Sequence, residues 1–413
     1  MRQLGTQVKT QAAHLRHAEY FMNVLAESKR LYKLGNENIL TGLALFDRER
    51  TNIETGQAWT AAHPQDPAAA KLCNLYPNAG AYVLDLRLHP QEQITWLEAA
   101  LEAARVLGNR EYEGAHLGNL GIAYKDLGEP RRAIEYHEQA LVIDREIGNR
   151  RGEGAGLNNL GLAWAALGEL RQAIEYYEQD LAIAREIGDQ RCEGNALNNL
   201  GLAWAALGEP RRAIEYYEQD LVITRQIGDR RAEGQALGNL GNAFLYLDEP
   251  RRAIDYYEQR LVIAREIGDR RGEGNALGNL GSVYKDLGEP RRAIDYYEQH
   301  LTIACEIGDR RGEETALGNL GSAYKRLGEL DRAIDYYEQA LAIDRAIGDR
   351  QGEANDCWNL GLLLEQQGEL PRAVELMQVR VDFLRAIGHP DAEKAAARVE
   401  QIRQKLKDKQ IKS

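Results

Sequence analysis

The stretch Arg151–Gln190 reads RGEGAGLNNLGLAWAALGELRQAIEYYEQDLAIAREIGDQ, and close copies of it follow one another at a spacing of 40 residues. The tripeptide Asn-Leu-Gly marks the register of the copies, beginning at residues 119, 159, 199, 239, 279, 319 and 359. A fixed period of this length is typical of solenoid proteins, in which each unit packs only on its neighbours. The sequence therefore predicts one repeat array rather than a series of independent domains.

Each copy contains the patterns of two amphipathic helices. In its first half Leu157, Leu160 and Trp164 recur at steps of three and four residues, which places them on one side of a helix. In its second half Ala173 and Tyr177 begin another stripe of the same kind. A glycine follows the second helix in every copy and is well suited to a left-handed C-terminal cap. The predicted fold class is all-α, built from helix-turn-helix units.

These residues carry a family resemblance. Asn159-Leu160-Gly161, together with Trp164, Ala173 and Tyr177, resembles the signature of the tetratricopeptide repeat (TPR). The unit is longer than the usual ~34 residues and is similar to the 40-residue variety of Pins/LGN-type adaptors and kinesin light chains. The resemblance implies a right-handed superhelical solenoid whose concave groove binds extended peptides.

The repeat pattern also predicts the domain organisation. We expect a helical cap region at 1–70, about eight 40-residue units at 71–388 with a degenerate first unit, and a capping helix at 389–413. The N-terminal run HAEYFMNVLAESKRLY, followed by FDRERTNIETGQAW, resembles the segment that opens the helical sensor region of bacterial STAND (NB-ARC-like) signalling ATPases.

Composition and motifs narrow the class of function. The net charge of −12 and the isoelectric point near 5.4 argue against a nucleic-acid partner. The sequence lacks an apolar run of about 18 residues and the apolar core of a signal peptide, so we expect a cytoplasmic protein with no membrane partner. The four cysteines are far apart, and no catalytic or phosphate-binding motif occurs. We therefore expect no enzyme activity, no cofactor and no metal site.

An invariant asparagine column is the first candidate binding feature. In the resembling families this position faces the groove, where an amide can both donate to and accept from a peptide backbone. The alternative is a hydrogen bond to the neighbouring helix. The column consists of Asn119, Asn159, Asn199, Asn239, Asn279, Asn319 and Asn359.

The positions beside this column vary along the array. Leu162, Leu202 and Tyr246 make the earlier copies apolar, whereas Lys285, Lys325 and Arg326 make the later copies basic. This gradient predicts an extended partner with apolar residues bound near 151–250 and acidic residues near the three cations. The alternative is neutral drift on an unused surface.

Three main functions are compatible with the sequence. The first is a non-catalytic scaffold that binds a peptide or protein segment in its groove. The second is the sensing region of a bacterial STAND signalling ATPase whose NTPase domain is absent from this sequence. The third is a self-assembling structural repeat protein. The partner and the oligomeric state stay open.

Overall fold

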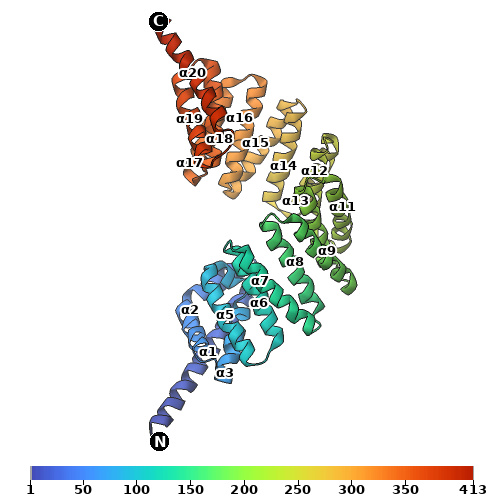
Figure 1. The fold of residues 1–413 in the computed structure, drawn as a ribbon, viewed down its shortest axis with the longest axis vertical. Coiled ribbons are helices and arrows are strands. Elements are labelled where there is room, and N and C mark those ends of the chain that lie inside the picture. Colours follow the sequence, from blue (N-terminus) through green and yellow to red (C-terminus); the bar gives the residue numbers. More distant parts are fainter. Residues whose placement is uncertain (1, 413) are drawn as a thin grey trace. The chain divides into compact units, whose positions relative to one another are not determined.

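The computed structural model describes residues 2–412, with side chains from residue 9 to residue 408. Within this range the chain forms twenty helices and no strand (Figure 1). The predicted all-α fold of helix-turn-helix repeats is confirmed. The chain divides into two compact units, Met1–Ile223 and Thr224–Ser413, which we describe separately. None of the helices in the described range is both long and apolar enough to span a bilayer.

The first unit combines an irregular helical start with regular helix pairs. Its irregular part contains α1 (Arg2–Leu34), α2 (Glu37–Ala61), α3 (Pro67–Gly80) and the short α4 (Val83–Arg87). The regular part contains α5 (Pro90–Val106), α6 (Arg110–Asp126), α7 (Pro130–Glu146), α8 (Arg150–Ala166), α9 (Leu170–Ile187), α10 (Gln190–Ala206) and α11 (Pro210–Ile227), the helix in which the division falls.

A separate core holds the irregular part together. It contains Leu25, Phe46 and Ile53, all fully buried. The Tyr76 hydroxyl is buried with them and donates to the Ala18 carbonyl at 2.8 Å. Because a buried phenol needs a hydrogen-bond partner, this contact fixes α3 against α1.

The second unit continues the pairs to the end of the chain. It contains α12 (Arg230–Tyr246), α13 (Pro250–Ile267), α14 (Arg270–Asp286), α15 (Pro290–Ile307), α16 (Arg310–Leu327), α17 (Leu330–Ile347), α18 (Arg350–Gln367), α19 (Leu370–Ala386) and α20 (Ala392–Lys412). The last helix buries Val399 and Ile402 in a cluster with residues of α19. We call the first helix of each pair helix A (α6, α8 and the following even-numbered helices to α18) and the second helix B.

Local signals in the sequence set the ends of these helices. Gly268 adopts a φ of 68° at the end of α13, a left-handed conformation that costs glycine little. Asp269 then caps α14, because its side chain accepts a hydrogen bond from the Gly272 amide at 2.9 Å. Pro290 starts α15, where its missing N–H removes no helical hydrogen bond. Each turn is thus determined by neighbouring residues.

The glycine of Asn-Leu-Gly allows helix A and helix B of one pair to approach closely. A methyl group at Gly161 would lie 2.6 Å from Cδ1 and 2.9 Å from Cζ of Tyr177. The Tyr177 ring is only 2 % exposed, and Ala173, one turn earlier, is fully buried. The same helix–ring contact recurs between Gly281 and Tyr297. These columns are therefore packing residues, as the sequence predicts.

The large residue that follows in helix A is also part of the core. Tyr284 is 5 % exposed and stacks on Tyr296 of helix B, with ring centroids 5.4 Å apart. The Arg292 guanidinium lies 3.8 Å from the centroid of the Tyr284 ring. Such a cation–π contact stabilises the pair by about 0.5–1 kcal/mol at an exposed site. The aromatic column thus joins the two helices rather than forming a ligand cage.

Candidate peptide-binding surface

One side of each helix A carries the asparagine column. Residues three, four and seven positions apart share a helix face, so Asn119, Ile122 and Asp126 lie together on α6. The corresponding side of the other A helices carries variable positions three or seven residues after the asparagine: Leu162, Leu202, Tyr246 and Arg326. Lys285 and Lys325 stand six residues after their asparagines, about 120° further round the helix, and border this side. We call this side the helix-A face.

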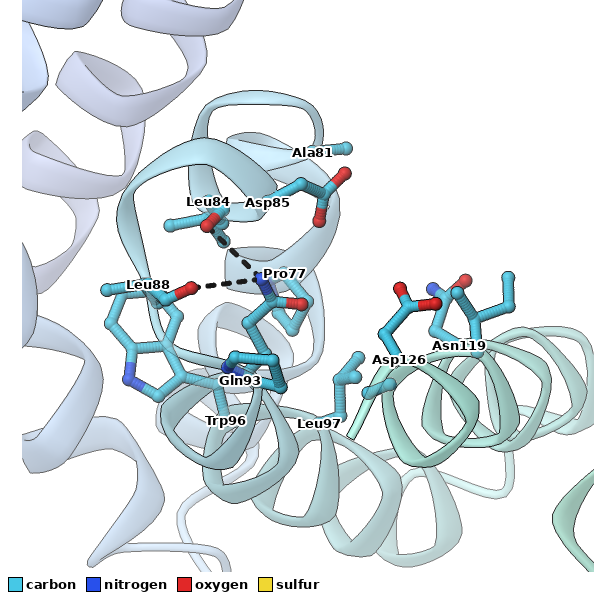
Figure 2. Close-up of a pocket in the computed structure, with 13 residues that line it drawn as sticks. Pro77, Ala81, Leu84, Asp85, Leu88, Gln93, Trp96, Leu97, Asn119 and Asp126 are labelled. Atoms are coloured by element: carbon cyan, nitrogen blue, oxygen red, sulfur yellow. Dashed lines mark hydrogen bonds between the residues drawn. The ribbon is translucent and has the colours of Figure 1, made fainter. Parts of the chain in front are cut away.

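The helix-A face of the first unit borders a cleft of about 460 Å³. Leu84 and Leu97 are among the apolar residues of its lining, and Asn119 lies at its edge. Figure 2 shows Asp85 on one side of the cleft and Asn119 and Asp126 on the other. An apolar interior with carboxylates on both sides suits an apolar side chain that has a cationic group next to it.

The short helix α4 forms one wall of this cleft, and α5 holds it in place. The Gln93 amide donates to the carbonyls of Leu84 at 3.3 Å and Leu88 at 3.4 Å (Figure 2). Trp96, 7 % exposed, packs edge-on against Tyr76, with ring centroids 6.0 Å apart. The wall is therefore anchored to the core, and the cleft is preformed.

The asparagines of the first unit differ in their surroundings. Asn119 is exposed, whereas Asn159 and Asn199 are half-buried. The Asn199 amide donates to the Asn158 side-chain oxygen at 2.8 Å, which ties α10 to α8. At Asn199 the column therefore has the structural role that the sequence analysis keeps as the alternative.

In the second unit Asn279, Asn319 and Asn359 lack such a neighbour. The residue 41 positions earlier, which is Asn158 for Asn199, is a glycine for each of them: Gly238, Gly278 and Gly318. Asn279, Asn319 and Asn359 are half-buried, and in the described part of the chain their side chains make no hydrogen bond. Asn239 has an interaction within the chain. Three amides of this unit thus remain available to a ligand.

The apolar residues predicted for the groove are only partly accessible. Leu162 is half-buried and packs against the core cluster that contains Ala173 and Leu200. Leu202 and Tyr246 are 46 % and 78 % exposed. Leu202 and Tyr246 offer apolar surface, whereas Leu162 contributes mainly to the fold.

The predicted basic residues of the second unit are partly engaged with one another. Arg326 of α16 donates to the Lys285 carbonyl at 2.8 Å and contacts the Asp286 carboxylate at 3.4 Å. Burial lowers the pKa of the half-buried Lys285; the Asp286 carboxylate opposes this shift, and the nearby Arg326 adds to it. Lys325 is half-buried on the same helix. The group carries three cations and one carboxylate, so it still favours an anionic partner.

The sequence analysis missed the cleft around Asp85. Most of its lining comes from residues 77–97, where the repeat signature is degenerate, and one wall is the short α4. The signal that could have indicated it is the exposed acidic pair Asp85 and Asp126 beside apolar residues.

Comparisons with known proteins agree with this architecture. The family model of the tetratricopeptide repeat matches residues 90–146, 153–221, 233–306 and 312–386. Among curated proteins nothing matches the chain.

Solved structures with the same fold include signalling proteins. A STAND protein with a tetratricopeptide repeat sensor from Pyrococcus horikoshii is 16 % identical, with a TM-score of 0.60, and the match covers 90 % of this chain and 64 % of that protein. The quorum sensor NprR from B. thuringiensis is 15 % identical, with a TM-score of 0.57 and coverages of 84 % and 96 %. RapI is 16 % identical, with a TM-score of 0.54 and coverages of 67 % and 99 %. At these identities the similarity concerns the fold alone.

Proposed function

Because the chain belongs to the tetratricopeptide repeat family, we propose that it is a non-catalytic scaffold that binds an extended peptide or protein segment along the helix-A face. Neither a nucleic acid nor a membrane is part of the proposal. The proposed location is the cytoplasm, where the four free cysteines would stay reduced.

The preformed cleft of the first unit is the observation that carries this proposal. Its apolar lining supports binding of an apolar side chain, since removing such a side chain from water is favourable by about 25 cal/mol per Å². Asp85 and Asp126 at its sides favour a Lys or Arg next to that residue. The exposed Asn119 amide lies at the edge of the cleft and can bind the peptide backbone.

The second unit would bind a different part of the partner. Asn279 and Asn319 offer amides to a peptide backbone, and Lys285 and Lys325 favour an acidic side chain. The backbone of an extended segment can form hydrogen bonds with these side-chain amides whatever its sequence, whereas the cleft and the cations select particular side chains.

The test of the cleft begins with peptides selected from a random library on the intact chain. Fluorescence anisotropy then compares their affinity for the parent and for the variant with Asp85→Asn and Asp126→Asn. We expect the variant to bind a peptide with an apolar residue beside Lys or Arg at least about tenfold more weakly, or ~1.4 kcal/mol.

The matched control for this test is Glu135→Gln on α7, an exposed carboxylate outside the cleft. It should leave the affinity unchanged. Equal affinity of the parent and the cleft variant would reject the cleft as the binding site.

The test of the second unit reverses charge at Lys285, Lys325 and Arg326. The substitutions should leave the helical circular dichroism intact and weaken peptides that carry acidic residues. Arg291→Glu on α15, an exposed cation without an ion pair in the described residues, is the control. Unchanged affinity for a selected acidic peptide would reject its contact with these three cations. That result would not bear on the cleft, which the Asp85→Asn and Asp126→Asn variant tests separately.

A second candidate function is the sensing region of a STAND signalling ATPase. The observation that favours it is the match to the Pyrococcus horikoshii STAND protein, which covers 90 % of this chain but only 64 % of that one. Genomic sequence decides between the two: an ATPase domain encoded in the same reading frame supports the sensor, and its absence supports a free-standing scaffold.

A further inference from the structure

Three carboxylates from successive helices converge near the C-terminal end of the array. Glu314 of α16, Asp344 of α17 and Asp356 of α18 each place one oxygen within 4.8 Å of the others. Asp344 is fully buried and Asp356 is 5 % exposed. Both oxygens of Asp344 and Oδ2 of Asp356 lack a hydrogen-bond partner. Isolated buried carboxylates are strongly unfavourable, so this cluster needs a compensating group.

The repeat scaffold itself does not need these carboxylates. At the position of Glu314 the four preceding copies carry glycine, at Gly154, Gly194, Gly234 and Gly274. At the position of Asp356 the four preceding copies carry alanine, at Ala196, Ala236, Ala276 and Ala316. Asp344 likewise stands where Ala184, Ala264 and Ala304 stand. Acidic side chains thus stand at three positions where most other copies carry small ones, two in the copy that begins at Arg311 and one in the next, and their oxygens converge.

An earlier copy shows what a satisfied carboxylate looks like here. Asp144 occupies the same repeat position as Asp344, and the Asn149 amide donates to it at 2.7 Å. At the position of Asn149 the later copy has Asp349, whose carboxylate accepts from the Gly352 amide at 2.9 Å. A carboxylate in this role cannot donate, so the change from Asn149 to Asp349 removes the donor that Asp344 would need.

The described side chains supply no cation to the cluster. Arg345, the nearest arginine in sequence, donates to Glu353 at 2.7 Å. In the described part of the chain no lysine or arginine forms an ion pair with Glu314, Asp344 or Asp356. The unpartnered oxygens of Asp344 and Asp356 therefore need protons or an external cation as compensation.

We propose that Glu314, Asp344 and Asp356 bind one hard divalent cation, of the class of Ca²⁺ and Mg²⁺. Two ligand oxygens on opposite sides of Ca²⁺ are about 4.8 Å apart, because each lies roughly 2.4 Å from the ion. The separations within the cluster are therefore short enough for all three carboxylates to share one ion.

The donor set determines the class of metal. Carboxylate oxygens are the ligands that hard cations prefer. The sulfur of Cys357, next to Asp356, is not among the ligand atoms that lie within 4.8 Å of one another, so the cluster offers oxygen alone. An ion held by α16, α17 and α18 would lock three consecutive helices together. This would stabilise the part of the helix-A face that carries Asn319 and Asn359, whether or not that face binds a peptide.

The test uses the full chain, freed of metal with a chelator. Equilibrium dialysis against Ca²⁺, Mg²⁺ or Mn²⁺ followed by elemental analysis measures the bound metal, and thermal unfolding measures its effect. We expect one ion per chain and a Tm that rises with the concentration of the ion, because the ion binds only the folded state. The separate arms identify which cation binds best.

The other copies of the repeat indicate which substitutions the fold tolerates at these three positions. The triple substitution Glu314→Gly, Asp344→Ala and Asp356→Ala restores residues that other copies carry, so the variant should fold. It should bind no ion, and its Tm should not change with the concentration of the cation. Its Tm should lie above that of the metal-free parent, because the unpartnered buried carboxylates are gone. The single Glu314→Gly changes the least buried ligand and should weaken binding at least about tenfold. Asp335→Asn, an exposed carboxylate on α17, is the control and should bind as the parent does.

Two results would overturn the proposal. One is a parent that binds none of the three cations above the level of the triple variant and whose Tm responds only to pH, which would show that the carboxylates share protons. The other is a triple variant that retains the bound ion, which would place the metal elsewhere.

Discussion

The close approach of Gly161 to the Tyr177 ring gives a quantitative prediction within a single helix. Substitution of either Gly161 or Gly156 by alanine in α8 removes the helix penalty of glycine, a gain of about 0.8–1.0 kcal/mol. A methyl at Gly156 would meet only Leu141 atoms at 3.9 and 4.0 Å, which is ordinary contact. Ala196 occupies the same position of the next copy and is fully buried there. We therefore expect Gly156→Ala to stabilise the protein by about 1 kcal/mol.

At Gly161 the same methyl overlaps the Tyr177 ring. Three ring atoms lie within 2.9 Å of its position, and the buried ring cannot move without displacing helix B. Overpacking of this kind costs about 1–3 kcal/mol. Because the helix-propensity gain is common to both variants, it cancels in their difference. Gly161→Ala should therefore be less stable than Gly156→Ala by roughly 1–3 kcal/mol.

Hydrogen exchange by mass spectrometry measures this difference locally. Opening of a repeat array does not have to be two-state, so protection of peptides from α8 and α9 is more informative than one global midpoint. The expected difference in protection between the two variants is roughly 5- to 150-fold. Equal protection would refute the reasoning, since it would mean that the Tyr177 ring can yield to a methyl group without loss of packing.

Three further predictions follow from single features of the fold. Burial raises the pKa of Asp180 to about 7, so the folded state retains a proton that the unfolded state releases near pH 4. The free energy of unfolding should therefore fall by a few kcal/mol as the pH rises from about 4 to 7. Urea titrations at each pH measure this dependence, and Asp180→Ala, the residue found at Ala140, should flatten it. Deletion of residues 271–310 should leave a folded helical protein, because each 40-residue repeat packs only on its neighbours. Its urea m-value should be lower by roughly a tenth, in proportion to the surface removed. Loss of a cooperative unfolding transition would contradict this. Asn199→Ala should lower the free energy of unfolding by about 1 kcal/mol through its lost bond to Asn158, whereas Asn279→Ala, measured in the same way, should change it by less than about 0.5 kcal/mol.

Much of the fold was predictable because its signals are local. The spacing of Leu157, Leu160 and Trp164 predicts helix A, and the glycine after each helix B predicts the turn, without reference to distant residues. The packing role of Ala173 is also visible in the repeat, because every copy carries alanine at this position and a small residue lets two helices approach closely. The candidate site was less predictable. The asparagine column is visible in the sequence, but only the structure shows that Asn199 bonds to Asn158 while Asn279 makes no hydrogen bond in the described residues.

The sequence by itself determined the repeat, the helix pairs and the identity of the face that varies between copies, because these depend on residues within one 40-residue unit. The tertiary structure alone decided which side chains from different helices meet. The cleft beside Asn119 depends on how the short α4 rests on α5, and the cluster of Glu314, Asp344 and Asp356 depends on three helices that converge. The cleft arises from contacts with the irregular start of the chain, and the carboxylate cluster from contacts between neighbouring repeats. Helical periodicity indicates which face of a helix a residue occupies, but not which neighbour that face will contact.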